Sequence, residues 1–119
     1  MARRLYQDQE HCPVARTLNV LGDRWTLLIV RDILAFRRHR FTELLESLPG
    51  ISPNLLSQRL KQLEDAGIVR RELYSEHPPR MEYRLTEKGK ALGPVLSAMR
   101  DWGDRYEPSP EEHTTGQAP

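Results

Sequence analysis

The sequence is poor in cysteine and has no long apolar run. Its one cysteine, Cys12, rules out a disulfide within the chain. No apolar stretch approaches the roughly 20 residues that a helix needs to cross a membrane. The first residues, 1–11, lack the apolar core of a signal peptide. These absences predict a cytoplasmic protein with no membrane partner.

Recognisable catalytic and metal-binding patterns are also missing. The four histidines are scattered, and apart from the adjacent His11-Cys12 none has zinc-ligand spacing to a second ligand. Neighbours in sequence seldom point at one another, so this pair is also a poor candidate for nucleophilic catalysis. No Ser-His-Asp set, paired carboxylates or phosphate-cradling glycine loop is recognisable. We therefore expect no enzymatic activity, no metal and no other cofactor.

Length and charge indicate one small domain. The chain has 119 residues, of which 38% are hydrophobic and 29% charged, which suits a domain that completes its core by pairing with another copy. The net charge of +1 hides an asymmetry. Residues 107–119 contain three acidic residues and no Lys or Arg, so residues 1–106 carry 18 basic and 14 acidic side chains, a net +4. This modest positive charge is a minor indication of a nucleic-acid partner.

Apolar spacing predicts two helices near the start of the chain, over 12–21 and 24–35. Gly22 separates them, and Asp23 is a suitable N-cap for the second. The second helix has a wide apolar face and is expected to be the central core helix. The apolar positions are Val14, Leu18 and Leu21 in the first helix and Trp25, Leu28, Ile29 and Ile33 in the second.

Two further helices are predicted over 42–48 and 53–66. Ser52 is a good N-cap for the second of them, and Pro53 suits its first position. The break between them, PGIS, has the length of a helix-turn-helix connection. Burial of this second helix is expected along Leu56, Leu60 and Leu63.

The pattern changes after this pair of helices. Alternating side chains over 69–75 and 81–85 predict two short strands, joined by a proline-stiffened tip at EHPPR. Thr86 then caps a last helix, which Gly93-Pro94 should kink near its start. A hairpin directly after a helix-turn-helix forms the wing of a winged helix. The predicted fold is mainly α with a small β-hairpin, a winged helix-turn-helix.

The last predicted helix carries an apolar stripe at heptad spacing. Such a stripe is typical of a seam between helices of two subunits. The alternative is that it packs only on the core of its own chain, although its last two members lie far along the helix. The stripe consists of Leu92, Val95, Met99, Trp102 and Tyr106.

The helix over 53–66 contains no acidic residue before Glu64. An α-helix fits the major groove of DNA, where Asn, Gln, Ser and Arg read base edges by hydrogen bonds and acidic side chains meet a negative field. Its N-terminal N–H groups also attract phosphate. We interpret it as a DNA-recognition helix; the alternative is a solvated amphipathic helix. The residues expected to face DNA are Ser52, Pro53, Asn54, Ser57, Gln58, Arg59 and Lys61.

Basic residues flank this motif. The run FRRHRF at 36–41 is a basic linker or a short strand. Within it, Arg38 and Arg40 precede the first helix of the motif, and His77 and Arg80 lie at the predicted tip of the hairpin. We interpret these four as contacts to the DNA backbone, which set register without reading sequence. The alternative is a set of solvated basic loops.

Three long motifs occur in order along the chain: CPVARTLNVLGDRWTLLIVRDIL, RFTELLESLPGISPNLLSQRLKQLEDAGIVRR and EYRLTEKGKALGPVL, followed by Trp102-Gly103. From about Cys12 to Trp102, the sequence resembles the HxlR-type winged helix-turn-helix transcriptional regulators of bacteria. The resemblance implies a homodimer that binds palindromic operator DNA, and we expect a repressor. It also implies that the first and last helices join the subunits, through Val14, Leu18 and the apolar stripe.

Cys12 lies where members of this family carry a cysteine. In some members that cysteine resembles a thiol switch, which responds to electrophiles, quinones or oxidants. Such a switch needs thiolate character and access. A helix N-terminus and Arg16, one turn on, favour the thiolate. The alternative is that Cys12 only packs at the dimer interface. A small-molecule effector bound between the dimer helices and the core is a further hypothesis.

The expected organisation is an N-terminal arm over 1–11, a winged helix-turn-helix domain with dimerisation helices over 12–106, and a disordered acidic tail over 107–119. The expected function is sequence-specific regulation of transcription on double-stranded DNA. The alternative is a winged-helix module for protein–protein assembly. That role needs an exposed apolar patch on the predicted recognition helix, where Leu55 is the only candidate.

Overall fold

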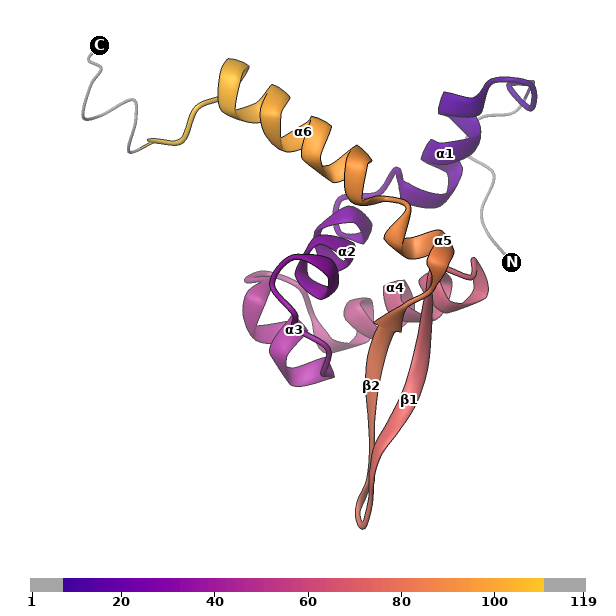
Figure 1. The fold of residues 1–119 in the computed structure, drawn as a ribbon, viewed down its shortest axis with the longest axis vertical. Coiled ribbons are helices and arrows are strands. Elements are labelled where there is room, and N and C mark those ends of the chain that lie inside the picture. The colour runs from indigo at the N-terminus through magenta and orange to yellow at the C-terminus, as the bar shows by residue number, and fades with distance from the viewer. Residues whose placement is uncertain (1–7, 111–119) are drawn as a thin grey trace.

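The structure, a computed structural model, describes residues 8–110 (Figure 1). None of the helices in this range is long and apolar enough to cross a membrane. A mainly α fold with one antiparallel hairpin is observed, which confirms the predicted fold class. The elements are α1 (Pro13–Leu21), α2 (Thr26–Leu34), α3 (Phe41–Ser47), α4 (Pro53–Asp65), β1 (Val69–Glu76), β2 (Pro79–Leu85), α5 (Glu87–Lys90) and α6 (Gly93–Tyr106).

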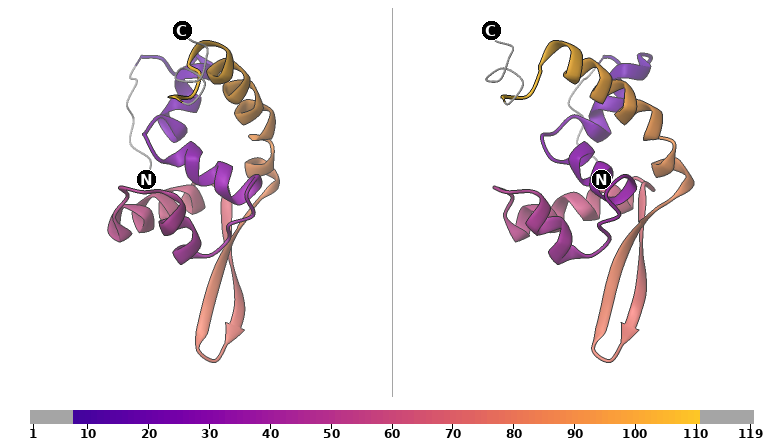
Figure 2. Two further views of the ribbon diagram at one scale, coloured as in Figure 1. Left: turned by 90° about the vertical axis from the view of Figure 1, so that its left-hand side faces the viewer. Right: turned by 60° about the vertical axis from the view of Figure 1, so that its left-hand side comes forward.

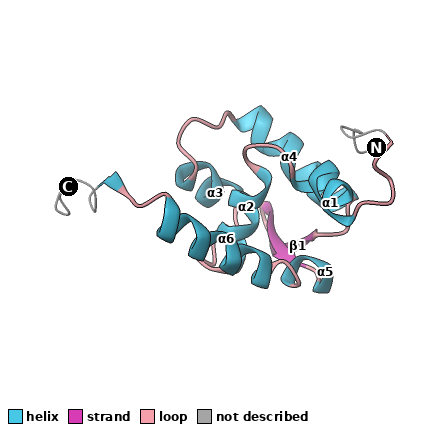
Figure 3. Cartoon of the chain, turned by 90° about the horizontal axis from the view of Figure 1, so that it is seen from above, coloured by secondary structure: helices cyan, strands magenta, loops and turns pink. Residues whose placement is uncertain are grey.

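The elements are arranged in three levels along the long axis of the molecule. Helices α2, α3 and α4 form the central body, and the β1–β2 hairpin projects from it (Figures 1 and 2). Helices α1 and α6 lie at the end opposite the tip of the hairpin in each of these views. Seen from above, α1 and α6 leave the body in different directions (Figure 3).

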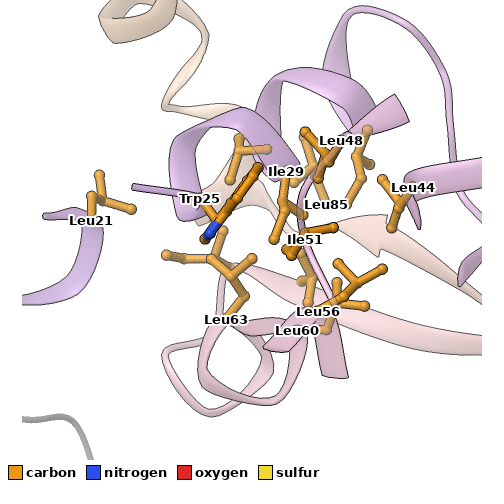
Figure 4. Close-up of a cluster of buried hydrophobic side chains, with 14 residues drawn as sticks. Leu21, Trp25, Ile29, Leu44, Leu48, Ile51, Leu56, Leu60, Leu63 and Leu85 are labelled. Carbon is orange, nitrogen blue, oxygen red and sulfur yellow. The ribbon is translucent and has the colours of Figure 1, made fainter. Parts of the chain in front are cut away.

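The core is built where α2, α3, α4 and the base of the hairpin meet. Figure 4 shows leucine, isoleucine and tryptophan side chains from these elements pointing toward one another. The predicted stripe of α4, Leu56, Leu60 and Leu63, is fully buried, because residues three and four apart share one face of a helix. Ile29 of α2 is buried as well, whereas Leu28 only packs partly against this core.

Helix α2 starts two residues later than its sequence predicts. Asp23 still caps the segment: its carboxylate accepts hydrogen bonds from the backbone N–H groups of Trp25 at 2.7 Å and Thr26 at 3.0 Å, and from the Thr26 hydroxyl. Residues 24 and 25 form a turn ahead of the helix. The capping role is therefore confirmed, and only the boundary moves.

The prediction of one kinked helix after Thr86 is wrong, because the structure has two helices, α5 and α6, with a break at residues 91 and 92. Pro94 has no N–H and cannot continue the hydrogen bonds of α5, but it is tolerated in the first turn of a new helix. The Thr86 cap is confirmed, since its hydroxyl accepts from the Gly89 N–H at 3.1 Å. The break turns α6 away from the body.

The hairpin is longer and its turn tighter than predicted. The strands pair out to Glu76 and Pro79, so the connection is His77-Pro78 rather than EHPPR. The run before α3 is a linker and not a strand. It is attached to the hairpin by one backbone hydrogen bond, from the Tyr83 N–H to the His39 carbonyl at 2.7 Å.

Replacing Leu60 with alanine will destabilise the domain by about 2–5 kcal/mol, because the leucine is 1% exposed and leaves a cavity at the junction of the central helices. Urea unfolding followed by circular dichroism measures this change. Glu46→Ala, at an exposed position of α3, is the control and should stay within about 0.5 kcal/mol of the parent. A cost for Leu60→Ala as small as that of the control would contradict the described core.

Candidate nucleic-acid interface

Helix α4 has a buried apolar side and an exposed polar side. The Ser52 hydroxyl accepts from the Leu55 N–H at 3.1 Å and caps the helix, and Pro53 occupies its first turn. Leu55 is partly buried against the core. The predicted DNA-facing residues that are exposed are Ser52, Pro53, Asn54, Ser57, Gln58 and Lys61.

Arg59 differs from the rest of the predicted set. Its side chain is only 21% exposed, and its Nε lies 3.3 Å from the carboxylate of Asp23. A guanidinium nitrogen also lies 3.4 Å from the side-chain oxygen of Gln62. Arg59 therefore ties α4 to the start of α2, and a base contact from it requires this ion pair to open.

The carboxylate of Asp23 is held in its charged form. Burial acts to raise its pKa, but the hydrogen bonds from the Thr26 hydroxyl and from the Trp25 and Thr26 N–H groups, together with the Arg59 guanidinium, lower it below its ordinary value. The same carboxylate thus caps α2 and orients a side chain of α4. This connection holds the two helices in register.

Acidic side chains gather at the C-terminal end of α4 and are paired there. Glu64 lies 3.3 Å from Arg71 of β1, and Asp65 lies 3.3 Å from Lys61. Residues 47–63 contain no Asp or Glu. The N-terminal half of α4 therefore combines a helix N-terminus with neutral or basic side chains, an arrangement that attracts anions.

Arg40 lies at the start of α3 and contacts the hairpin. Its guanidinium carbon is 4.1 Å from the ring centroid of Tyr74, and its Nε is 3.9 Å from a carboxylate oxygen of Glu82. The side chain is half exposed. Arg38 is more enclosed and stacks over the ring of Phe36 at 5.7 Å. Arg40 is thus the more accessible of the two predicted backbone contacts.

Two predicted wing residues, His77 and Arg80, are exposed. They flank the tip of the hairpin, at the end of the molecule away from α1 and α6 (Figure 1). This position leaves both side chains accessible to a large partner. Neither has an ion pair with another residue in the range 8–110.

Sequence reasoning missed Glu43 and Tyr74. The Glu43 carboxylate accepts from the N–H groups of His39 at 3.0 Å and Arg40 at 3.1 Å, which lowers its pKa. A glutamate at the third helical position is a known capping signal and could have been found. No local signal marks Tyr74, because its contact with Arg40 joins segments far apart in the chain.

Helices α1 and α6 expose large apolar side chains. Leu92 packs partly against the core of its own chain, whereas the rest of the stripe on α6 is open. Apolar surface of this extent on one chain is typical of an interaction site. The exposed members are Val14, Leu18, Val95, Met99, Trp102 and Tyr106.

Cys12 is the N-cap of α1. Its Sγ accepts from the Ala15 N–H at 3.5 Å, and the side chain is half-buried. The Arg16 guanidinium donates to the Glu10 carbonyl at 2.6 Å instead of pairing with the thiol. The thiol is therefore placed on a helix that also exposes Val14 and Leu18. Most of the predicted arm and tail, residues 1–7 and 111–119, lies outside the described residues.

Residues 20–111 match the model of the HxlR-like helix-turn-helix family. The chain belongs to this family. An HTH-type transcriptional regulator of Bacillus subtilis, YdeP, is 38% identical over 99 residues, which cover 83% of this chain and 77% of the relative. A regulator of the same type from Methanothermobacter thermautotrophicus is 38% identical over 112 residues, 94% of this chain and 84% of the relative.

Solved structures of transcriptional and redox regulators share the fold. The reduced form of the transcriptional regulator YodB from B. subtilis is 41% identical, covers 82% of this chain and 97% of its own, and has a TM-score of 0.68. The redox regulator HypR in its oxidised form is 39% identical. The match covers 79% of this chain and 96% of the HypR chain, with a TM-score of 0.69. The predicted family and the predicted class, a DNA-binding transcription regulator, are confirmed.

The cap at Glu43 will make the stability of the domain depend on pH. Because its pKa is lowered from 4.5 by folding, the stabilisation is present above about pH 5 and is lost as the pH falls through the folded pKa. Glu43→Ala should cost about 0.3–1.5 kcal/mol at pH 7 and clearly less at pH 3, as measured by urea unfolding.

The exposed Glu46 on the same helix provides the matched control for this experiment. Glu46→Ala should show a smaller cost with little change between the two pH values. An equal cost of Glu43→Ala at pH 7 and pH 3 would show that the charged carboxylate does not cap α3.

Proposed function

We propose that the protein is a cytoplasmic, sequence-specific transcriptional repressor that binds a palindromic operator as a homodimer. The observation that carries this proposal is the exposed, acid-free surface of α4 before Glu64; the helix follows a helix-turn-helix connection and precedes a hairpin. A helix with this surface fits the major groove of DNA. Family membership supports the DNA-binding class.

Base reading is assigned to the exposed amides and hydroxyl of α4. Asn and Gln side chains can pair with adenine through two hydrogen bonds, and Ser can bond to several base edges. Asn54, Ser57 and Gln58 have these groups and are exposed. Lys61 lies one turn further on and is assigned to a phosphate. Arg59 is assigned to positioning α4 through Asp23, with a base contact only after that ion pair opens.

Backbone contacts are assigned to Arg40 at the start of α3 and to His77 and Arg80 at the hairpin tip. Each is exposed and basic or able to donate a hydrogen bond. Arg38 is a minor member of this group because its guanidinium is partly buried over Phe36. Contacts of this kind position a protein on DNA without reading its sequence.

Dimerisation is assigned to the exposed apolar side chains of α1 and α6. Met99, Trp102 and Tyr106 are each more than half exposed in the single chain. Burying them against a second copy removes apolar surface from water. The two copies of α4 would then reach major grooves about 34 Å apart on one face of the duplex, which requires a palindromic site.

Cys12 is the candidate sensor in this proposal. HypR is described as a redox regulator, and Cys12 lies on a helix assigned to the dimer interface. With one cysteine per chain, oxidation would join Cys12 to the same residue of a second copy or to a small thiol, with two electrons passing to an oxidant such as a peroxide or quinone. A change at this helix would alter the spacing of the two α4 helices.

The assembly-module alternative is disfavoured by the surface of α4. It requires an apolar patch on this helix, and Leu55, the candidate, packs against the core. No large apolar side chain is exposed within α4, which the structure describes in full. The polar surface matches DNA better than it matches a protein partner.

Replacing Gln58 with alanine will weaken binding to the operator by about 1–3 kcal/mol and leave binding to unrelated DNA nearly unchanged, because a base contact is lost. Fluorescence anisotropy at about 150 mM salt, with operator and scrambled duplexes, measures both affinities. Gln9→Ala, which removes the same side chain outside α4, is the control. Equal weakening on every sequence would exclude a base-reading role for Gln58.

Replacing Arg80 with alanine will weaken binding to all duplexes alike, because a phosphate contact carries no sequence information. The slope of log affinity against log salt concentration should fall by about one unit. Arg100→Ala, which removes the same charge from the exposed surface of α6, should leave the slope unchanged. An unchanged slope for Arg80→Ala would place the hairpin tip away from DNA.

A further inference from the structure

A cavity of about 460 Å³ lies at the base of the hairpin. Its walls come from the end of α2, the linker before α3, both strands and α5. This volume falls in the range of pockets that hold small molecules. We name it the wing-base cavity, and the charged residues that line it are Arg37, Arg70, Glu72, Arg84 and Lys90.

The walls of this cavity carry an excess of positive charge. Four cationic side chains and one carboxylate, that of Glu72, line it. Outside the lining, Arg84 also pairs with Glu82, and Lys90 lies 3.5 Å from Glu87. Glu72 is shared, with Arg70 at 2.5 Å and Arg84 at 3.8 Å. Arg37 makes no ion pair among residues 8–110. A hollow lined mainly by one sign of charge concentrates the opposite ion.

The backbone at Arg37 adds an independent observation. Its φ is +57°, in the left-handed region that a long side chain rarely adopts. Glycine or asparagine would adopt this conformation at lower cost. The linker nevertheless has an arginine there, and that arginine lines the cavity. Arg37 thus places a charged side chain at the cavity with an uncommon backbone conformation.

The hairpin separates the cavity-lining side chains of β1 from the C-terminal end of α4. Successive residues of a strand point to opposite faces. Arg70 and Glu72 lie on one face of β1 and line the cavity, whereas Arg71 lies on the other face and pairs with Glu64 of α4. A ligand held by Arg70 therefore lies on the face of β1 opposite the Arg71–Glu64 pair.

The linker connects the cavity to the first helix of the motif. It supplies Arg37 to the cavity, and two residues later the His39 carbonyl accepts from Tyr83 of β2. The His39 and Arg40 N–H groups donate to Glu43 at the start of α3. A ligand that moves the linker will therefore also move the start of α3 and the side chain of Arg40.

We propose that the wing-base cavity binds a small multivalent anion of metabolite size, with phosphate or clustered carboxylate groups held by Arg37, Arg70, Arg84 and Lys90. The bound anion changes the affinity for operator DNA through the linker. Anion binding stands apart from the proposed function, whereas its effect on DNA rests on that function.

Isothermal titration calorimetry of the full chain with sodium pyrophosphate tests anion binding, with sodium chloride holding ionic strength constant. Saturable binding of one pyrophosphate per chain is expected. Arg37→Asn should weaken it about fivefold or more, because a charge-assisted contact is lost at a position where asparagine suits the backbone. Arg100→Gln removes the same charge from α6 and should change the affinity less than twofold. Citrate in place of pyrophosphate distinguishes a carboxylate ligand from a phosphate ligand.

The absence of saturable binding up to about 10 mM pyrophosphate would overturn the proposal. So would equal weakening by Arg37→Asn and Arg100→Gln, since that is the behaviour of general charge attraction. A third contrary result concerns Arg70→Gln. If this variant loses operator affinity and salt dependence but keeps its affinity for pyrophosphate, the cavity is a contact to the DNA backbone.

Fluorescence anisotropy with operator DNA tests the effect on DNA binding. Saturating pyrophosphate should shift the operator affinity of the parent protein but not that of Arg37→Asn. In the parent protein, bound operator should shift the affinity for pyrophosphate by the same factor. Binding of pyrophosphate without such a shift would overturn the regulatory part. Failure to bind any operator would contradict the proposed function and leave the calorimetric result standing.

Discussion

The burial of one side of α4 is the constraint on which the rest of the molecule depends. Leu56, Leu60 and Leu63 pack against α2 and α3, and this packing determines which side of α4 faces solvent. The Arg59–Asp23 ion pair and the caps at Ser52 and Glu43 refine the positions of the helices around that core. If the leucine stripe were displaced by one position, Gln58 and its neighbours would no longer form one polar surface.

The parts of the fold that follow from local spacing were predictable from the sequence. The stripe of α4 and the caps at Ser52, Asp23 and Thr86 depend on residues within a few positions of each other. The break before α6 was not predictable, because Gly93-Pro94 is compatible with a kink and with a new helix. The contacts of Arg40 with Tyr74 and of Arg59 with Asp23 join distant segments, and no periodicity reveals them.

Three surfaces surround the core, and each has a different chemistry. The exposed side of α4 before Glu64 is polar and free of acids, the wing-base cavity is lined mainly by cationic side chains, and α1 and α6 expose apolar side chains. The linker at residues 36–40 lines the cavity and leads into α3, the first helix of the helix-turn-helix. We assign these separate surfaces to DNA, a small anion and a second copy, and short segments of one domain connect them.

The central claim is that α4 reads a specific sequence. Fluorescence anisotropy at about 150 mM salt, comparing the DNA upstream of the protein's own gene with a scrambled duplex of equal length, tests it most directly. If α4 reads a specific sequence, the native duplex will be preferred by a factor on the order of 10³ or more. Equal weak binding to both, lost steeply as salt rises, would contradict it and would reduce the interface to a basic surface.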